Sequence, residues 1–473
     1  MKSVYILFII MYCNISSSSQ ITFERLYELY SDDSQGYSVV QNFDNGYVIA
    51  GTSGKITSQK KIIVFRTNEY GDTIWIRRIA CDWGGAEGYS ILITQDNSII
   101  VCGRYNYNIP LIKIDQSGTI ISITEIGVNP GIVEIGYSVK QTLDSGYIIT
   151  GQSYPYSGRS DAYLARTDNS GDTLWTRKFG EFWLEEIGYD VIQTSDSGFL
   201  VAGYSMNDST WLNKVLLVKT DQNGSLQWMK RLGNDDSDNR ATSIAETSDQ
   251  GLIIAGNTGN YSVCEILLLR LNKNGDTVWR KSILPANSGY AYAESIKITA
   301  DQGFIITGTN GFGVFLLRTD SSGNVVWSRD FSELWTWGFE VSLTTDSGYI
   351  VTGYSDDPGY YLKRVYLVKT DEDGLITNTQ EHQPDIPFIA FPDPAITRIT
   401  IKMPEGLVGM KGSEEEMGLE VFDIYGRLIY SRAIPDENPV EIDVSAWSEG
   451  IYMARLIGRN DVPGNVKFMV KRK

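Results

Sequence analysis

The stretch Asp144-Ser-Gly-Tyr-Ile-Ile-Thr-Gly151, followed by Thr167-Asp-Asn-Ser-Gly-Asp-Thr-Leu-Trp175, is repeated along the chain with small changes. Seven copies of the first motif recur at intervals of 52, 48, 52, 53, 52 and 45 residues. Counted at the second residue after the aspartate, they fall at Gly46, Ser98, Gly146, Gly198, Gly251, Gly303 and Gly348. A nearly constant period over most of 473 residues indicates one tandem array rather than a series of unrelated domains.

Each repeat has the pattern of four short strands joined by tight turns. In the third repeat we expect strands at 137–142, 147–151, 161–166 and 172–177. β-Branched and aromatic residues are enriched in these segments, and helical spacing is absent. Four strands in about 50 residues is the size of one propeller blade. The sequence therefore predicts an all-β chain that begins with a seven-bladed β-propeller over residues 20–378.

Tryptophan recurs at one place on the fourth strand of five repeats, where we expect it to pack against the neighbouring blade. These residues are Trp75, Trp175, Trp228, Trp279 and Trp327. The seventh repeat has no such tryptophan, but the segment 21–27 matches the fourth-strand pattern, with Phe23 in the tryptophan position. The N-terminal strand is therefore predicted to complete blade 7. The turn and tryptophan together resemble the tryptophan-docking repeats of PQQ-type quinoprotein propellers. That family's cofactor ligands have no counterpart here, so the resemblance implies blade architecture only and no cofactor is expected.

Residues 1–19 have the layout of a secretory signal peptide: Lys2, an apolar run, and then small residues. No segment is long enough for a membrane-spanning helix. The net charge is −17, nearly all of it in the repeats, which argues against nucleic acid or anionic membranes as partners. Cys81, Cys102 and Cys264 lack the spacing of metal ligands, so no metal site is predicted.

After a linker at 379–390, the segment 391–473 alternates short strands and predicts a small Ig-like β-sandwich. It contains Pro392-Asp-Pro-Ala395, Val421-Phe-Asp-Ile-Tyr-Gly-Arg427, Gly450-Ile-Tyr452 and a basic last strand. Together these features resemble the C-terminal sorting domain of the type IX secretion system of Bacteroidetes. The resemblance implies export across the cell envelope, recognition by the type IX secretion machinery, and a secreted or cell-surface location.

The connections between strands 2 and 3, and between successive blades, lie on one face of a propeller and are rich in aromatic residues here. Variable loops on a rigid scaffold are where binding sites usually lie. Aromatic rings beside polar side chains suit a sugar ring, and peptide binding uses similar chemistry. We therefore expect a glycan or protein ligand; the alternative is that these aromatics only cover the blades. The candidate ligand-binding residues are Trp83, Tyr154, Tyr156, Trp183, Trp211, Tyr292, Trp335 and Trp337.

The innermost strands carry a second set of aligned residues that could line the central channel. They are Ser38, Ser90, Ser138, Asp190, Ser243, Ser295 and Glu340. Asp190 and Glu340 could bind a cation, act as an acid/base pair, as in a carboxylate-dependent polysaccharide hydrolase or lyase, or bond neighbouring blades. The only histidine, His382, lies in the linker, so no histidine-based catalytic site is expected in the propeller. No catalytic residue is predicted, and a non-catalytic structural or adhesion protein of the cell surface is a third alternative.

Overall fold

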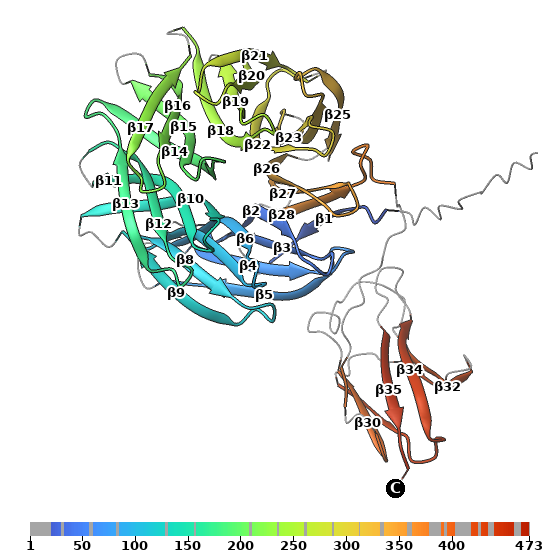
Figure 1. Cartoon of the computed structure of the whole chain (residues 1–473). Helices are drawn as coiled ribbons and strands as arrows, with labels where there is room; N and C mark the ends of the chain where they lie inside the picture. The colour runs from blue at the N-terminus through green and yellow to red at the C-terminus, as the bar shows by residue number, and fades with distance from the viewer. Residues whose placement is uncertain are drawn as a thin grey trace, which may run out of the picture. The chain divides into compact units, whose positions relative to one another are not determined.

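A computed structural model of the chain separates into two compact units, Met1–Thr379 and Gln380–Lys473 (Figure 1). No helix of the described residues is long and apolar enough to cross a membrane. The structure describes residues 20–29, 33–55, 60–81, 85–127, 131–155, 158–207, 211–233, 236–259, 263–285, 288–311, 313–331, 335–356, 362–377, 389–391, 395–402, 418–423, 427–433, 439–457 and 465–472.

The described part of the first unit forms seven four-stranded antiparallel sheets, each of which is one propeller blade. The first strands of adjacent blades lie against one another around the central channel, and the chain passes from blade to blade in order (Figure 1). The all-β prediction with a seven-bladed propeller is confirmed. From the channel outward the strands are β2 (Ser34–Gln41), β3 (Tyr47–Ser53), β4 (Lys61–Thr67) and β5 (Thr73–Ile79) in blade 1; β6 (Ala86–Ile93), β7 (Ile99–Tyr105), β8 (Ile109–Ile114) and β9 (Ile120–Ile126) in blade 2; β10 (Ile132–Gln141), β11 (Tyr147–Pro155), β12 (Asp161–Thr167) and β13 (Thr173–Phe179) in blade 3; β14 (Leu184–Gln193), β15 (Phe199–Asn207), β16 (Leu212–Thr220) and β17 (Leu226–Leu232) in blade 4; β18 (Asp238–Glu246), β19 (Leu252–Gly259), β20 (Cys264–Leu271) and β21 (Thr277–Ile283) in blade 5; β22 (Tyr292–Ile298), β23 (Phe304–Thr309), β24 (Val314–Thr319) and β25 (Val325–Phe331) in blade 6; and β26 (Thr336–Leu343), β27 (Tyr349–Asp356), β28 (Lys363–Thr370) and β1 (Phe23–Tyr27) in blade 7.

Blade 7 is assembled from both ends of the propeller sequence. Strand β1 pairs antiparallel with β28, and Phe23 lies opposite Lys369. In blade 3 the residue at the same register position is Trp175, opposite Arg166, so Phe23 does stand in the tryptophan position. The N-terminal strand thereby covers the edge of β28, which would otherwise expose unpaired backbone groups.

The recurrent tryptophans hold adjacent blades together, as expected. A Cβ added at Gly224 of blade 4 would lie 2.7 Å from the ring of Trp175 in blade 3, and Gly224 has a φ of +78°. The Arg177 guanidinium lies 5.3 Å from the centroid of the same indole ring. The glycine therefore both permits the turn and leaves space for the neighbouring indole.

The aspartate of the repeated motif is structural. In blade 3 Asp144 accepts a hydrogen bond from Thr142 Oγ1 at 2.6 Å and forms an ion pair with Arg166. The corresponding pairs in the six other blades include Asp249 with Arg270 and Asp346 with Lys369. The most conspicuous residue of the sequence repeat therefore fixes a turn to the third strand.

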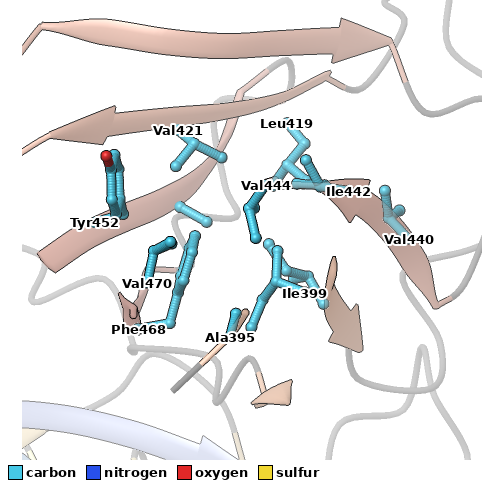
Figure 2. Packing of buried hydrophobic residues seen from close by; sticks show 12 residues of the cluster. Ala395, Ile399, Leu419, Val421, Val440, Ile442, Val444, Tyr452, Phe468 and Val470 are labelled. Carbon is cyan, nitrogen blue, oxygen red and sulfur yellow. The ribbon is translucent and has the colours of Figure 1, made fainter. Parts of the chain in front are cut away.

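The described residues of the second unit form a three-stranded and a four-stranded sheet. Buried side chains of both sheets pack together, as Figure 2 shows for Ile399 and Ile442 facing Val421 and Phe468. A bridge between Ala395 and Val470 joins the two sheets, with the Ala395 N–H donating to Met469 O at 2.7 Å. The strands are β29 (Ile389–Phe391), β30 (Arg398–Lys402) and β33 (Val440–Asp443), and β32 (Leu428–Ala433), β31 (Gly418–Asp423), β34 (Gly450–Ile457) and β35 (Asn465–Val470).

Candidate functional site

A β-bulge interrupts the innermost strand of each blade at one shared position. In β10, for example, the register shifts between Gly136 and Ser138, so Tyr137 lies outside the ladder. An extra residue of this kind re-aims its side chain, and here it faces the central channel. The seven extra residues, all within the described strands, are Tyr37, Tyr89, Tyr137, Tyr189, Thr242, Glu294 and Phe339.

Five of these seven side chains are aromatic and belong to five consecutive blades. Ring centroids are separated by 4.9 Å between Phe339 and Tyr37 and by 5.1 Å between Tyr37 and Tyr89. The series continues with 5.3 Å from Tyr89 to Tyr137 and 5.4 Å from Tyr137 to Tyr189. We call these five residues the aromatic belt. Burial raises the pKa of the Tyr137 and Tyr189 phenols, so both hydroxyls stay protonated at neutral pH.

The belt is interrupted in blades 5 and 6, where Thr242 and Glu294 occupy the bulge position. A cavity of about 550 Å³ lies at this gap and is lined by the belt on its other side. We call it the outer cavity. Its remaining described lining comes from the ends of strands in blades 4, 5 and 6: Trp211, Leu212, Asn213, Asp238, Arg240, Asn257, Thr258, Gly259, Cys264 and Tyr292.

The polar side of the outer cavity is built around Arg240. Its guanidinium forms an ion pair with Asp238, with Nε 3.3 Å from Oδ2, and lies 5.1 Å from the ring centroid of Tyr204. Asn257 is fixed by its Oδ1, which accepts the Ala293 N–H at 2.7 Å. Two charged groups and an amide are therefore held beside the aromatic belt.

Glu294 places a carboxyl group on the outer cavity. No hydrogen bond or ion pair joins its carboxylate to another described residue. Burial raises its pKa to about 7, against the opposing effect of the nearby Arg240 guanidinium. A carboxyl of this kind can either donate or accept a hydrogen bond near neutral pH. It is thus available to a ligand in the cavity.

The predicted channel residues lie beyond the belt, around an inner cavity of about 110 Å³. Its lining includes Lys140, Lys297 and the whole predicted set, Ser38, Ser90, Ser138, Asp190, Ser243, Ser295 and Glu340. The seven bulge residues line both the inner and the outer cavity. The belt position is therefore the boundary between them.

Asp190 joins three blades. Its carboxylate accepts hydrogen bonds from Ser138 Oγ at 2.8 Å and from Ser243 Oγ and Ile244 N at 3.1 Å each. The Lys140 ammonium lies 3.5 Å from Oδ1. Burial alone would raise the pKa of Asp190, but the lysine charges and the donated hydrogen bonds hold it below its ordinary value.

Glu340 makes the equivalent links on the opposite side of the ring. It accepts hydrogen bonds from Ser38 Oγ and from Val39 N, the latter at 3.2 Å, and from Lys297 Nζ at 3.1 Å. Each carboxylate thus joins its own set of three blades, and Lys140 and Lys297 lie within electrostatic reach of both carboxylates. These are the contacts that the inter-blade alternative predicts.

Of the eight candidate ligand-binding residues, Trp211 and Tyr292 line the outer cavity. Trp183 and Trp335 are 76% and 69% exposed and do not line it. Trp337 stacks on Tyr354, with ring centroids 4.9 Å apart, and Tyr354 in turn contacts Phe339 of the belt. Tyr154 is half-buried in β11, and Trp83, Tyr156 and His382 lie outside the described residues.

Reasoning from the sequence missed the belt, Glu294 and Arg240. A signal was present: Gly-Tyr-Ser recurs at 36–38, 88–90 and 136–138, with Gly-Tyr-Asp at 188–190 and Gly-Phe-Glu at 338–340. An aromatic residue at one fixed place in five innermost strands was therefore visible. The direction in which these side chains point was not visible in the sequence, because the β-bulge depends on how the strands pair.

Residues 389–471 match the family described as "Secretion system C-terminal sorting domain". The chain is a β-propeller with a type IX sorting domain. The sorting domain indicates secretion to the cell surface or the extracellular space and implies interaction with the type IX secretion machinery. Searches of curated proteins give no match to the chain.

Several solved structures resemble the chain at low identity. A polysaccharide lyase, Uly1, is 10% identical with a TM-score of 0.49, covering 72% of this chain and 90% of that one. Virginiamycin B lyase from Staphylococcus aureus is 13% identical with a TM-score of 0.48, covering 73% and 99%. The β-propeller domain of the Trilobed protease from Pyrococcus furiosus is 11% identical with a TM-score of 0.42, covering 75% and 98%. These similarities concern the fold alone.

Proposed function

We propose that this secreted β-propeller binds a glycan in its outer cavity, with the aromatic belt as the surface on which a sugar ring stacks. One observation carries the proposal. Five consecutive blades place an aromatic side chain at the same bulge position, beside a cavity of about 550 Å³. A volume of this size is in the range of small-ligand sites.

The chemistry around the cavity suits a sugar. The C–H face of a sugar ring packs on aromatic carbons, and its hydroxyls need donors and acceptors at the rim. Glu294 offers an unpaired carboxyl, Arg240 a guanidinium held by Asp238, and Asn257 an amide. A concave site favours a glycan over a folded protein, which requires a larger and flatter surface.

A carboxylate-dependent hydrolase or lyase is the second candidate function. The observation that favours it is the pair of carboxyl groups on the outer cavity, Glu294 and Asp238, together with the raised pKa of Glu294. Glycoside hydrolysis uses one carboxyl with a raised pKa as the acid and a second as the base or nucleophile. Asp190 and Glu340 do not support this candidate, because both line the inner cavity and neither lines the outer cavity.

The test is native electrophoresis of the chain from Gln20 onward through gels cast with xylan, laminarin, galactomannan or pullulan, each then stained for intact polymer. Retarded migration in one gel supports glycan binding, and a cleared zone supports the enzyme. Tyr137→Ala is expected to abolish retardation, whereas Trp183→Ala, outside the cavity, is expected to leave it unchanged. If no gel gives either response, or if Trp183→Ala alone removes it, the outer cavity is not the glycan site.

A further inference from the structure

We infer that the outer cavity receives the end of a saccharide chain rather than an internal segment, so that the propeller recognises glycan termini. This inference rests on the proposed function and specifies it. It follows from the small size of the inner cavity, from the hydrogen bonds that link the blades around it, and from the residues that line the outer cavity.

The space beyond the belt is too small for a sugar. The inner cavity has a volume of about 110 Å³. This is one fifth of the volume of the outer cavity, and it suits a small cluster of waters. Apart from the belt residues that border it, its described lining consists of polar side chains, such as Ser138, Asp190 and Lys297, which are suited to water. A chain that enters from the outer cavity therefore stops at the belt.

The strands around the inner cavity are also linked firmly from blade to blade. Asp190 links blades 3, 4 and 5, and Glu340 links blades 6, 7 and 1, through the hydrogen bonds described above. Smaller links complete the ring, such as the Ile91 N–H to Ser38 Oγ at 3.1 Å and the Val139 N–H to Ser90 Oγ at 3.2 Å. Widening the channel would break several buried polar contacts at once, which is costly.

Away from the belt, the described lining of the outer cavity comes from blades 4, 5 and 6. Beyond the bulge residues, its lining is drawn mainly from blade 5, with Arg240 on β18, Asn257 on β19 and Cys264 at the start of β20. Trp211 of blade 4 and Tyr292 of blade 6 stand on either side. The terminal sugar would therefore meet Glu294 and Tyr189 at the belt, while the next units pass between Trp211 and Tyr292.

The experiment is isothermal titration calorimetry with the polysaccharide retained in the gels and with its oligosaccharides of two to six units. End recognition predicts one propeller bound per chain, whatever the chain length, and an affinity that stops rising after about three units. Reduction of the reducing end with borohydride, or an O-methyl cap on the non-reducing terminal unit of a synthetic oligosaccharide, should lower affinity at least tenfold for one terminus only.

A pair of variants locates the terminal unit. Glu294→Gln should weaken binding of the disaccharide and the hexasaccharide alike, whereas Trp211→Ala should weaken the hexasaccharide by about three- to tenfold and the disaccharide less. Several propellers bound per polymer, with no effect of either terminal modification, would overturn end recognition while leaving glycan binding intact. Absence of binding to all four polysaccharides would overturn both. The terminal modifications alter only the sugar, so this result does not depend on how well a variant folds.

Discussion

The Trp228 ring of blade 4 fills the space in which a side chain at Gly275 of blade 5 would lie. A Cβ built on Gly275 would be 2.7 Å from the ring, and the Lys230 ammonium lies 5.3 Å from the ring centroid. The same relationship joins Trp279 to Gly323 and Trp327 to Gly374. The tryptophan of one repeat and the glycine of the next are thus two halves of a single contact between blades.

Gly275→Ala is expected to lower the free energy of unfolding by about 2 to 4 kcal/mol, because it combines a positive φ with displacement of an indole. The backbone φ at Gly275 is +76°. Gly171→Ala is the matched control, with a φ of +92° and Leu111 and Thr124 as neighbours instead of a tryptophan. We expect Gly171→Ala to lower the free energy of unfolding by about 1 to 2 kcal/mol. Urea unfolding followed by circular dichroism measures both losses. Equal losses at the two positions would contradict the role given to Trp228.

Phe23→Ala tests the closing of blade 7. Phe23 is 9% exposed and packs near Gly71 and Tyr47, so its loss is expected to cost about 3 kcal/mol of stability. Leu26→Ala, on the same strand but 37% exposed, should cost less than about 1 kcal/mol. Thermal unfolding of both variants makes the comparison. A loss at Phe23 no greater than at Leu26 would show that β1 contributes little to the ring.

Glu294 should make stability depend on pH. Its pKa is raised to about 7 from an ordinary 4.5, so below pH 4.5 the group is protonated in both the folded and the unfolded chain. As the pH rises from 4.5 to 7, Glu294 loses its proton in the unfolded chain but keeps it in the folded chain, so the free energy of unfolding falls. Above pH 7 the group is ionised in both states, and the free energy of unfolding falls no further. Tyr189 stays neutral across this range, because burial raises its pKa to about 12.

Glu294→Gln removes this dependence. The difference in free energy of unfolding between the variant and the unmodified chain should shift in favour of the variant by on the order of 2 kcal/mol when the pH is raised from 4 to 8. Glu372→Gln, at an exposed turn of blade 7, serves as the control and should show no such gain. Urea midpoints at the two pH values provide the measurement. A pH profile that is the same for the variant and the unmodified chain would mean that Glu294 ionises normally.

Asp190→Ala is expected to destabilise the propeller by about 3 kcal/mol, since it leaves Lys140 and several donors without a buried acceptor. Asp190→Asn retains an acceptor and should recover part of the loss. Asp276→Ala, which removes an exposed pair with Lys230, should remain close to the unmodified chain. Calorimetric melting temperatures would distinguish the three; an unchanged melting temperature for Asp190→Ala would show that the network is dispensable.

The blade count and the contact made by Trp175 could be predicted from sequence because both depend on patterns that repeat. The candidate functional site was harder to predict from the sequence. Trp211 and Tyr292 were among the predicted residues because they are aromatic and lie in variable connections, but so are Trp183 and Trp335, which do not line the cavity. Residue type and position in a variable connection do not distinguish Trp211 and Tyr292 from Trp183 and Trp335. Tyr137 was missed because neighbouring side chains of a regular β-strand point to opposite faces, so Tyr137 and Ser138 were not both expected to face the channel. The β-bulge at Tyr137 turns both side chains towards it.

The pairing of β1 with β28 has a consequence for the order of assembly during export. Tyr366 Oη donates a hydrogen bond to Glu24 at 2.7 Å, between residues 342 positions apart in the sequence. The first strand must therefore wait, unpaired, until nearly the whole propeller sequence has emerged on the same side of the membrane. Joining ends so distant is entropically costly and slow. A chain interrupted at any earlier blade would remain an open arc with two exposed sheet edges, so only a full-length polypeptide becomes a ring.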